Sequence, residues 1–354
     1  MAFAPICCLS ERAANHIIAP DGWGHLHRKG RNMMKLNMLI AALFGVFSGL
    51  APHIYAQAVE PYEYANPSSM ATKALILDVA EISDRLVAVG EFGHIIYSDD
   101  SGESWVQAQN VPTRNTITAI TFLDDKTGFA VGHDATILKT VDGGESWSLK
   151  YIERRGENPL FGIQFSSATF GVAVGAFSTV METKDGGETW AQRPLIEDGY
   201  DDFHLNGLFT DVAGNFYIPA EFGLVYKSQD GGRTFTGIQT AYEGSFWGGM
   251  ALANNNLLIW GMRGNAYISR DGGRSWLRSE TNTDRSISGG TQLADGTIVL
   301  TGLSGLVLVS RDNGRTFDAS VRSDRLSFAT VSSKSDSEVL LYGDPGVLPH
   351  ALSN

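Results

Sequence analysis

Six copies of one eight-residue pattern, Ser/Thr-x-Asp-x-Gly-x-x-Trp/Phe, recur along this chain. The steps between successive aspartates are 42, 43, 45, 41 and 41 residues. Repetition at this period indicates an array of similar supersecondary units that pack against their neighbours. An Asp in a tight turn accepts bonds from backbone N–H groups, and Gly allows unusual backbone angles, so we interpret each copy, called a box here, as a structural turn. The box aspartates are Asp100, Asp142, Asp185, Asp230, Asp271 and Asp312.

A second marker, a small residue, lies ten positions before each box aspartate and ends a β-rich run such as LVAVG (86–90). Another alternating run follows it, so each repeat predicts four antiparallel strands. Seven markers and six boxes predict an all-β, seven-bladed β-propeller with Asp-box repeats over residues 57–354. We expect an N-terminal strand near 59–65 (VEPYEYA) to close the incomplete last blade and remove a free sheet edge. The markers are Gly90, Gly132, Gly175, Ala220, Gly261, Gly302 and Gly343.

Residues 33–56 differ in character from the repeats. A basic Lys35, an apolar stretch over 36–51 and small-residue ends at Ala56 and Ala58 follow the order of a secretory signal. We therefore expect cleavage near Ala56–Ala58 and a periplasmic protein, with an uncleaved membrane anchor as the alternative. Residues 1–32 match neither a signal nor a domain, and we interpret them as an extension ahead of a true start at Met33 or Met34.

The net charge and the cysteine positions argue against nucleic-acid binding and against a disulfide framework. The net charge is −12, and residues 1–56 contribute five basic and two acidic side chains, so the rest of the chain is more acidic than the whole. This balance argues against nucleic-acid binding, which favours a basic face. Both cysteines, Cys7 and Cys8, precede the repeats, so the propeller needs no disulfide framework. We expect a monomer.

Catalytic and metal-binding signatures are sparse. The chain has no GxSxG, HExxH, GxxxxGK[ST] or CxxC motif. His94 and His133 fall near loops of adjacent repeats, but solvated loop histidines are commoner than metal ligands, so we expect no metal and no cofactor. Asp boxes also occur in sialidases and other glycosidase propellers, which need paired carboxylates at the site. A carbohydrate-active propeller is therefore the alternative, with Glu91, Glu221, Glu243 and Asp344 as its carboxylates.

Boxes of the DGGxSW type, each preceded by an AVG-x-x-G strand, resemble the photosystem II assembly and stability factor family. The resemblance covers residues 60–352 and implies an exported, non-enzymatic, seven-bladed propeller that acts on a membrane protein. The segments ENPLFGIQF (157–165) and YEGSFWG (242–248) are similar to those of a proteobacterial branch, in which it implies an envelope assembly or scaffold factor. Photosynthetic members carry an arginine-rich patch, whereas this chain offers scattered arginines such as Arg114.

Loops on a rigid scaffold are where binding usually resides, so we predict a working surface on the propeller face opposite the box turns. There it would dock an exported or membrane protein, an export-pump component being one candidate. Loops between second and third strands contribute Glu91, His94, His133, Asp134, Glu221, Arg263 and Asp344. The connections between blades contribute Arg154, Arg155, Glu157, Asn158, His204, Asn206, Tyr242, Glu243, Trp247 and Arg285.

Overall fold

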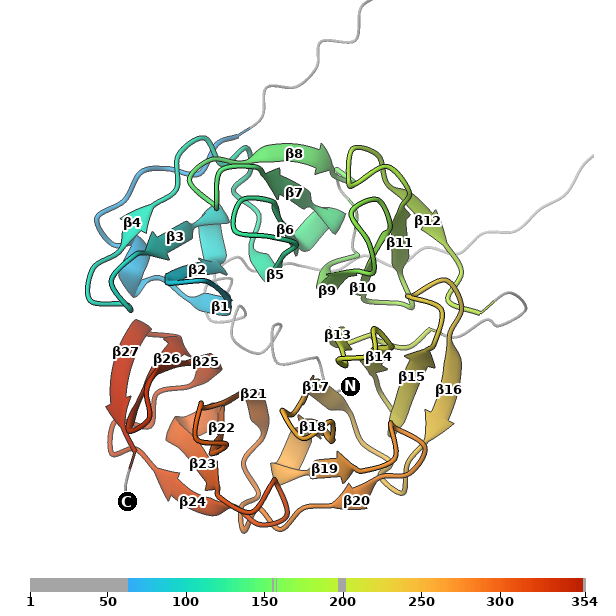
Figure 1. The fold of residues 1–354 in the computed structure, drawn as a ribbon. Coiled ribbons are helices and arrows are strands. Elements are labelled where there is room, and N and C mark those ends of the chain that lie inside the picture. The colour runs from blue at the N-terminus through green and yellow to red at the C-terminus, as the bar shows by residue number, and fades with distance from the viewer. Residues whose placement is uncertain (1–62, 155, 157, 197–201, 353–354) are drawn as a thin grey trace, which may run out of the picture. The chain divides into compact units, whose positions relative to one another are not determined.

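Seven antiparallel sheets make up the computed structural model, which describes residues 63–352 apart from 155, 157 and 197–201. The sheets form the blades of a ring, with the first strand of each blade toward the centre (Figure 1). First strands of neighbouring blades contact one another all the way round, and β25 of the last blade contacts β1 of the first. The predicted all-β, seven-bladed propeller is therefore confirmed.

The strands follow chain order within each blade. Blades one to three contain β1 (Ile76–Ile82), β2 (Arg85–Gly90), β3 (Ile95–Ser98), β4 (Val106–Gln107); β5 (Ile117–Phe122), β6 (Gly128–Gly132), β7 (Ile137–Thr140), β8 (Ser148–Tyr151); and β9 (Leu160–Phe165), β10 (Gly171–Gly175), β11 (Val180–Thr183), β12 (Ala191–Arg193). Blades four and five contain β13 (Phe209–Thr210), β14 (Phe216–Pro219), β15 (Leu224–Ser228), β16 (Thr236–Gln239); and β17 (Phe246–Ala251), β18 (Leu257–Gly261), β19 (Ala266–Ser269), β20 (Leu277–Arg278). Blades six and seven contain β21 (Ile287–Gln292), β22 (Ile298–Gly302), β23 (Leu306–Ser310), β24 (Asp318–Val321); and β25 (Phe328–Ser335), β26 (Glu338–Gly343), β27 (Gly346–Ala351). Short 3-10 turns lie at η2 (Ala71–Lys73), η3 (Glu91–Gly93), η4 (His133–Ala135), η5 (Met262–Gly264) and η6 (Leu303–Gly305).

The second strand of each blade explains the apolar runs in the sequence. Strands β6 (GFAVG) and β10 (GVAVG) are buried at every position, because each lies between two neighbouring blades. Outer strands face solvent, and β24 is exposed throughout. Seven apolar clusters form the core of the described chain, and each lies between two adjacent blades. Stability therefore depends on contacts between blades as well as on pairing within them.

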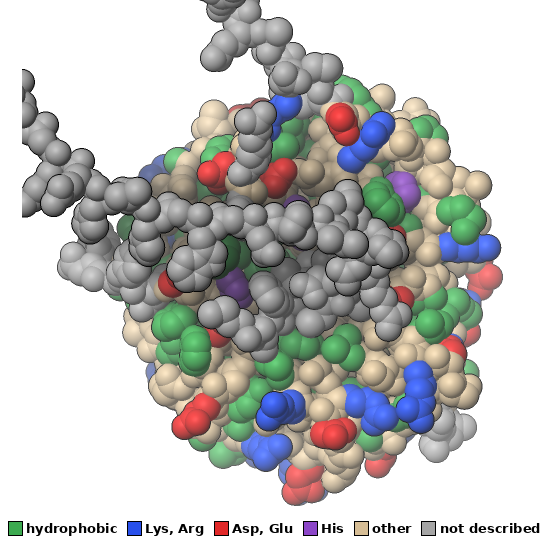
Figure 2. Space-filling model, turned by 180° about the vertical axis from the view of Figure 1, so that it is seen from behind, with side chains coloured by type: hydrophobic (Ala, Val, Ile, Leu, Met, Phe, Trp, Pro, Cys, Tyr) green, Lys and Arg blue, Asp and Glu red, His purple; other side chains and the backbone are tan. Residues whose placement is uncertain are grey.

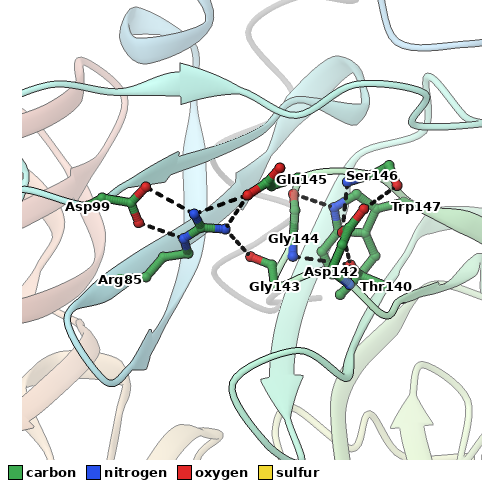
Figure 3. A network of polar contacts seen from close by, with 9 residues as sticks. All are labelled: Arg85, Asp99, Thr140, Asp142, Gly143, Gly144, Glu145, Ser146 and Trp147. Atoms are coloured by element: carbon green, nitrogen blue, oxygen red, sulfur yellow. Dashed lines mark hydrogen bonds and ion pairs between the residues drawn. The ribbon is translucent and has the colours of Figure 1, made fainter.

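Each box aspartate accepts hydrogen bonds across its own turn, as Asp142 does in Figure 3. Asp142 Oδ1 accepts the Thr140 hydroxyl at 2.7 Å and the Ser146 amide at 3.0 Å, while Oδ2 accepts the Ser146 hydroxyl. The Trp147 indole donates to the Gly144 carbonyl at 3.0 Å and its ring packs in the cluster shared with the preceding blade. Burial acts to raise the pKa of Asp142, but the bonds from Ser146 and Thr140 outweigh it and hold that pKa below its usual range.

Asp142→Ala should lower the free energy of unfolding by about 1–3 kcal/mol, because the turn loses three bonds to one carboxylate. A carboxyl whose pKa is depressed in the folded state stabilises above its ordinary pKa and less on acidification, so the difference should shrink below about pH 4. Urea unfolding at several pH values measures both effects. Asp84→Ala, at an exposed position, is the control, and equal losses in the two variants would contradict a structural role for the box.

A basic side chain from one blade reaches the box turn of the next. Arg85 donates to the Gly143 carbonyl at 3.1 Å and bonds both Asp99 and Glu145 (Figure 3). The same bridge recurs between the second and third blades, where Lys139 Nζ lies 2.8 Å from the Gly186 carbonyl. Between the fourth and fifth blades, Lys227 Nζ lies 2.7 Å from the Gly272 carbonyl. The box turns therefore join blades as well as closing hairpins.

The expected closing strand at 59–65 is not formed by the residues that the structure describes. The seventh sheet has three strands there, and the Ala65 amide donates to the Val111 carbonyl of the first repeat at 2.9 Å. The Arg114 guanidinium also bonds the Tyr64 carbonyl at 3.0 Å. This end of the segment pairs with the first repeat because its backbone groups find partners there. Residues 59–62, with the predicted signal and the extension before it, lie outside the described residues.

The first and last blades meet through their own side chains. The Ser333 amide donates to Glu81 at 3.2 Å, and Lys334 pairs with Glu103 at 2.9 Å. An apolar cluster that includes Ile76 and Tyr342 fills the space between the two blades. These contacts close the ring.

Candidate binding face

The loops between second and third strands share one backbone geometry. In six blades the second loop residue has a positive φ, from 52° to 58°. A residue with a side chain rarely adopts this conformation, and a bulky one there is an outlier. We call the propeller surface that carries these loops the loop face. The six residues are Phe92, Asp134, Phe177, Phe222, Arg263 and Ser304.

Three of these six residues are exposed phenylalanines. The exposed fractions are 57% for Phe92, 49% for Phe177 and 58% for Phe222. Strained backbone that carries a large side chain is concentrated at binding and catalytic sites, where the surrounding structure maintains it. Sequence reasoning missed these rings because phenylalanine in a β-rich chain is ordinarily a core residue. The available signal was a Phe two positions after the marker in three of the seven repeats.

Rings of the third and fourth blades form two pairs on the loop face. The ring centroids of Phe177 and His204 lie 5.0 Å apart, and those of Phe203 and Phe222 lie 5.2 Å apart. His204 Nδ1 accepts the Phe177 amide at 3.2 Å, and Glu221 accepts the His204 amide at 3.0 Å. These bonds tie the loop that carries Phe177 to the segment of Phe203 and His204, and that segment to the loop that carries Phe222.

A shallow hollow lies beside the fifth-blade loop. It is lined by Tyr242, Glu243, Arg263 and Arg278, so it presents charges of both signs around an aromatic ring. Burial raises the pKa of Tyr242, whose hydroxyl donates to the Met262 carbonyl at 3.3 Å. The loop face thus offers polar recognition next to its apolar tips.

Two of the four predicted carboxylates are engaged by backbone amides. Glu91 accepts the Leu75 amide at 3.0 Å, as Glu221 accepts that of His204, so both bind the chain that leads into the first strand of their blade. Burial lowers the pKa of His94 and of His133, which favours their neutral forms. Over the described ranges, no three His, Cys, Asp or Glu side chains are placed to share a metal ion.

The structure divides the predicted site residues into three groups. Three are buried: His94 beneath its loop, and Asn206 and Trp247 in the wall of a central cavity, which corrects their expected place on the open surface. Arg155 and Glu157 lie outside the described residues. The others are exposed or half-buried on the loop face, namely Glu91, His133, Asp134, Arg154, Asn158, His204, Glu221, Tyr242, Glu243, Arg263, Arg285 and Asp344.

Figure 2 shows Lys and Arg side chains together with Asp and Glu side chains around the rim of one face, among apolar and other residues. In the described part of the chain, no helix has the length and apolar character needed to cross a membrane.

The match to the sequence profile of a protein family shows the family of this chain. The family described as Photosynthesis system II assembly factor YCF48 matches residues 104–161 and 150–299. The chain belongs to this family. No curated protein sequence matches it.

Solved structures show the same fold at low sequence identity. One described as YCF48 bound to D1 peptide is 18% identical with a TM-score of 0.65, over 83% of this chain and 97% of that one. YCF48 from Cyanidioschyzon merolae is 13% identical with a TM-score of 0.62, over 82% and 98%. Virginiamycin B lyase from Staphylococcus aureus has a TM-score of 0.67 at 7% identity, over 80% and 96%. These likenesses concern the fold, which hosts unrelated functions.

Proposed function

We propose that this chain is a non-enzymatic assembly or scaffold factor whose loop face binds a segment of a membrane or exported protein. The observation that carries the proposal is the set of exposed phenylalanines Phe92, Phe177 and Phe222, each held at a positive φ on one face. Aromatic residues are enriched where proteins bind one another. The box turns, by contrast, have their polar groups occupied by internal bonds and serve as structural staples.

Family membership supports a role in assembly, and a structural relative is described as bound to a D1 peptide. An extended, partly apolar peptide would place side chains against the ring pairs that contain Phe177 and Phe222, and its polar groups in the hollow beside Arg263. The signal-like sequence of residues 33–56 supports a periplasmic location in this proposal, with an envelope or membrane protein as the partner.

The test uses the double variant Phe177→Asp/Phe222→Asp. We expect it to lose at least about tenfold in affinity for the partner, because two apolar contacts are replaced by charges, while its melting temperature stays unchanged. The partner is first identified by photo-crosslinking from position 177 in cells, and affinity is then measured with the purified segment.

Val212→Asp is the matched control. Val212 is a 78% exposed apolar residue in the turn between β13 and β14, on the face opposite the loops. It should neither crosslink nor affect affinity. Crosslinking from 212 but not from 177, or an unchanged affinity in the double variant, would place the binding surface elsewhere.

A further inference from the structure

A cavity of about 310 Å³ lies at the centre of the ring, lined by the first strands of all seven blades. Glycines at wall positions such as Gly162 and Gly289 let neighbouring inner strands approach closely, because an added Cβ would lie 2.7 Å from the Leu208 amide nitrogen and 2.5 Å from the Ala329 carbonyl oxygen. At Gly248, an added Cβ would lie 2.9 Å from the Trp260 indole nitrogen, so the absence of a side chain there makes room for that ring. The cavity is therefore a property of residues drawn from the whole ring.

A bulge near the start of the first strand directs side chains in six of the blades. One extra residue interrupts the pairing with the second strand at Leu77, Thr118, Phe161, Trp247, Ser288 and Ala329. Bulges re-aim side chains and recur next to binding sites. All six of these residues lie in the cavity wall.

Asp78 is the one charged residue among the described residues of that wall. Its Oδ1 accepts the Val79 amide at 2.9 Å, and its Oδ2 accepts the Ile120 amide of the next blade at 3.0 Å. Burial raises the pKa of this carboxyl to about 7, against the weaker effect of the two amides. An ionised Asp78 thus has hydrogen bonds but no opposite charge in the cavity.

Charged groups on the strands packed against β1 are engaged elsewhere. Glu81, further along β1, accepts the Ser333 amide, and burial raises its pKa. Arg85 of β2 pairs with Asp99, and Lys334 of β25 pairs with Glu103 and with Glu338 of β26. β5 carries no ionisable side chain. None of these groups supplies a counter-charge to Asp78.

Three further polar atoms of cavity-lining residues have no partner in the described structure. They are the indole nitrogens of Trp247 and Trp260 and the Oδ1 of Asn206. The three side chains are 4–5% exposed, and Asn206 donates its amide to the Phe246 carbonyl. Buried polar groups are normally paired, so unpaired ones on cavity-lining residues require either a polar ligand or ordered water.

We propose that the central cavity binds an α-amino amide, the chemistry of a free amino group followed by an amide. The ammonium group faces Asp78 and restores charge balance, and indole rings of the wall favour a cation as well. The amide carbonyl accepts from an indole N–H, and the amide N–H donates to Asn206 Oδ1. This site is independent of the loop face, so it stands whether or not a protein docks there.

Glycinamide and propionamide test the proposal, because they have nearly the same shape and differ in the ammonium group. With the full-length chain near neutral pH, titration followed by tryptophan fluorescence and calorimetry should show saturable binding of glycinamide and none of propionamide. Asp78→Asn should weaken glycinamide binding at least about tenfold, and Trp247→Phe about threefold or more. Asp84→Asn, an exposed aspartate two residues beyond β1, should bind as the unmodified protein does.

Three results would overturn the proposal: equal binding of both amides, unchanged glycinamide binding by Asp78→Asn, or no saturable signal up to about 50 mM glycinamide. Ordered water would then be enough to pair with the polar groups of the cavity wall. A competition experiment with tetraglycine amide distinguishes the two natural ligands that could carry an α-amino amide. Competition by this peptide with glycinamide assigns the site to the amino terminus of a polypeptide. Binding of glycinamide without competition assigns it to a small free molecule.

Discussion

Gly261→Ala should destabilise the propeller by about 3 kcal/mol or more, although it adds one methyl group. Gly261 ends the buried strand β18, and its φ of −175° is extended backbone that any residue can adopt. A Cβ there would lie 2.1 Å from the Ser245 carbonyl oxygen and 2.8 Å from the Phe246 Cα. Because Phe246 begins the inner strand β17 and Ser245 directly precedes it, the start of that strand would have to move. Urea unfolding measures the loss.

Gly214→Ala separates this collision from backbone strain. Gly214 has a φ of 79°, and an added Cβ would meet nothing within 4 Å. It should cost about 1–2 kcal/mol, the price of a left-handed conformation alone. If Gly261→Ala were no more damaging than Gly214→Ala, close packing would not be the reason for the recurring marker.

Asp78→Asn should stabilise the protein by about 1–3 kcal/mol at pH 8. The folded pKa of Asp78, about 7, lies above its ordinary value of 3.8, so the native state binds a proton more tightly than the unfolded chain. Between these two values, stability of the unmodified protein falls as pH rises, and it levels off above about pH 7. Asparagine removes the charge, but its one oxygen can keep only one of the two amide bonds, so the gain is smaller than the pKa difference alone would give.

Thermal and urea unfolding across pH 4–8 would show the two proteins converging at the acid end. Asp84→Asn, at an exposed site, should follow the unmodified protein throughout. A gap between Asp78→Asn and the unmodified protein that does not depend on pH would contradict the raised pKa. The variant is also expected to lose glycinamide binding while gaining stability, so unfolding could not account for that loss.

The blade number could be read from the sequence because each repeated residue has a local reason to recur. The carboxylate of Asp142 satisfies donors within four residues of itself, and Gly261 is required by a strand of its own blade. Such requirements repeat whenever the blade repeats. The placement of the predicted loop residues on one face follows from the same strand order.

The remaining features depend on contacts between distant segments. Ala65 pairs with Val111, and no local pattern in 59–65 predicts that choice over the edge of the last blade. The central cavity arises only when seven separate strands meet. Its one signal in the sequence was a charged residue, Asp78, within an apolar run. The exposed rings of Phe177 and Phe222 were missed for another reason, because phenylalanine in a β-rich chain is ordinarily a core residue.

The contacts between the first and last blades have a consequence for how the chain folds. The bond between Asp78 and Ile120 joins neighbouring blades 42 residues apart, whereas the bond between Glu81 and Ser333 spans 252 residues. Closing the longer loop costs about 1.6 kcal/mol more in chain entropy, so this junction forms after the other six and opens before them. During synthesis, the apolar side of the first blade that faces the last blade therefore stays exposed until the final residues emerge. The growing chain is most prone to aggregation through that side.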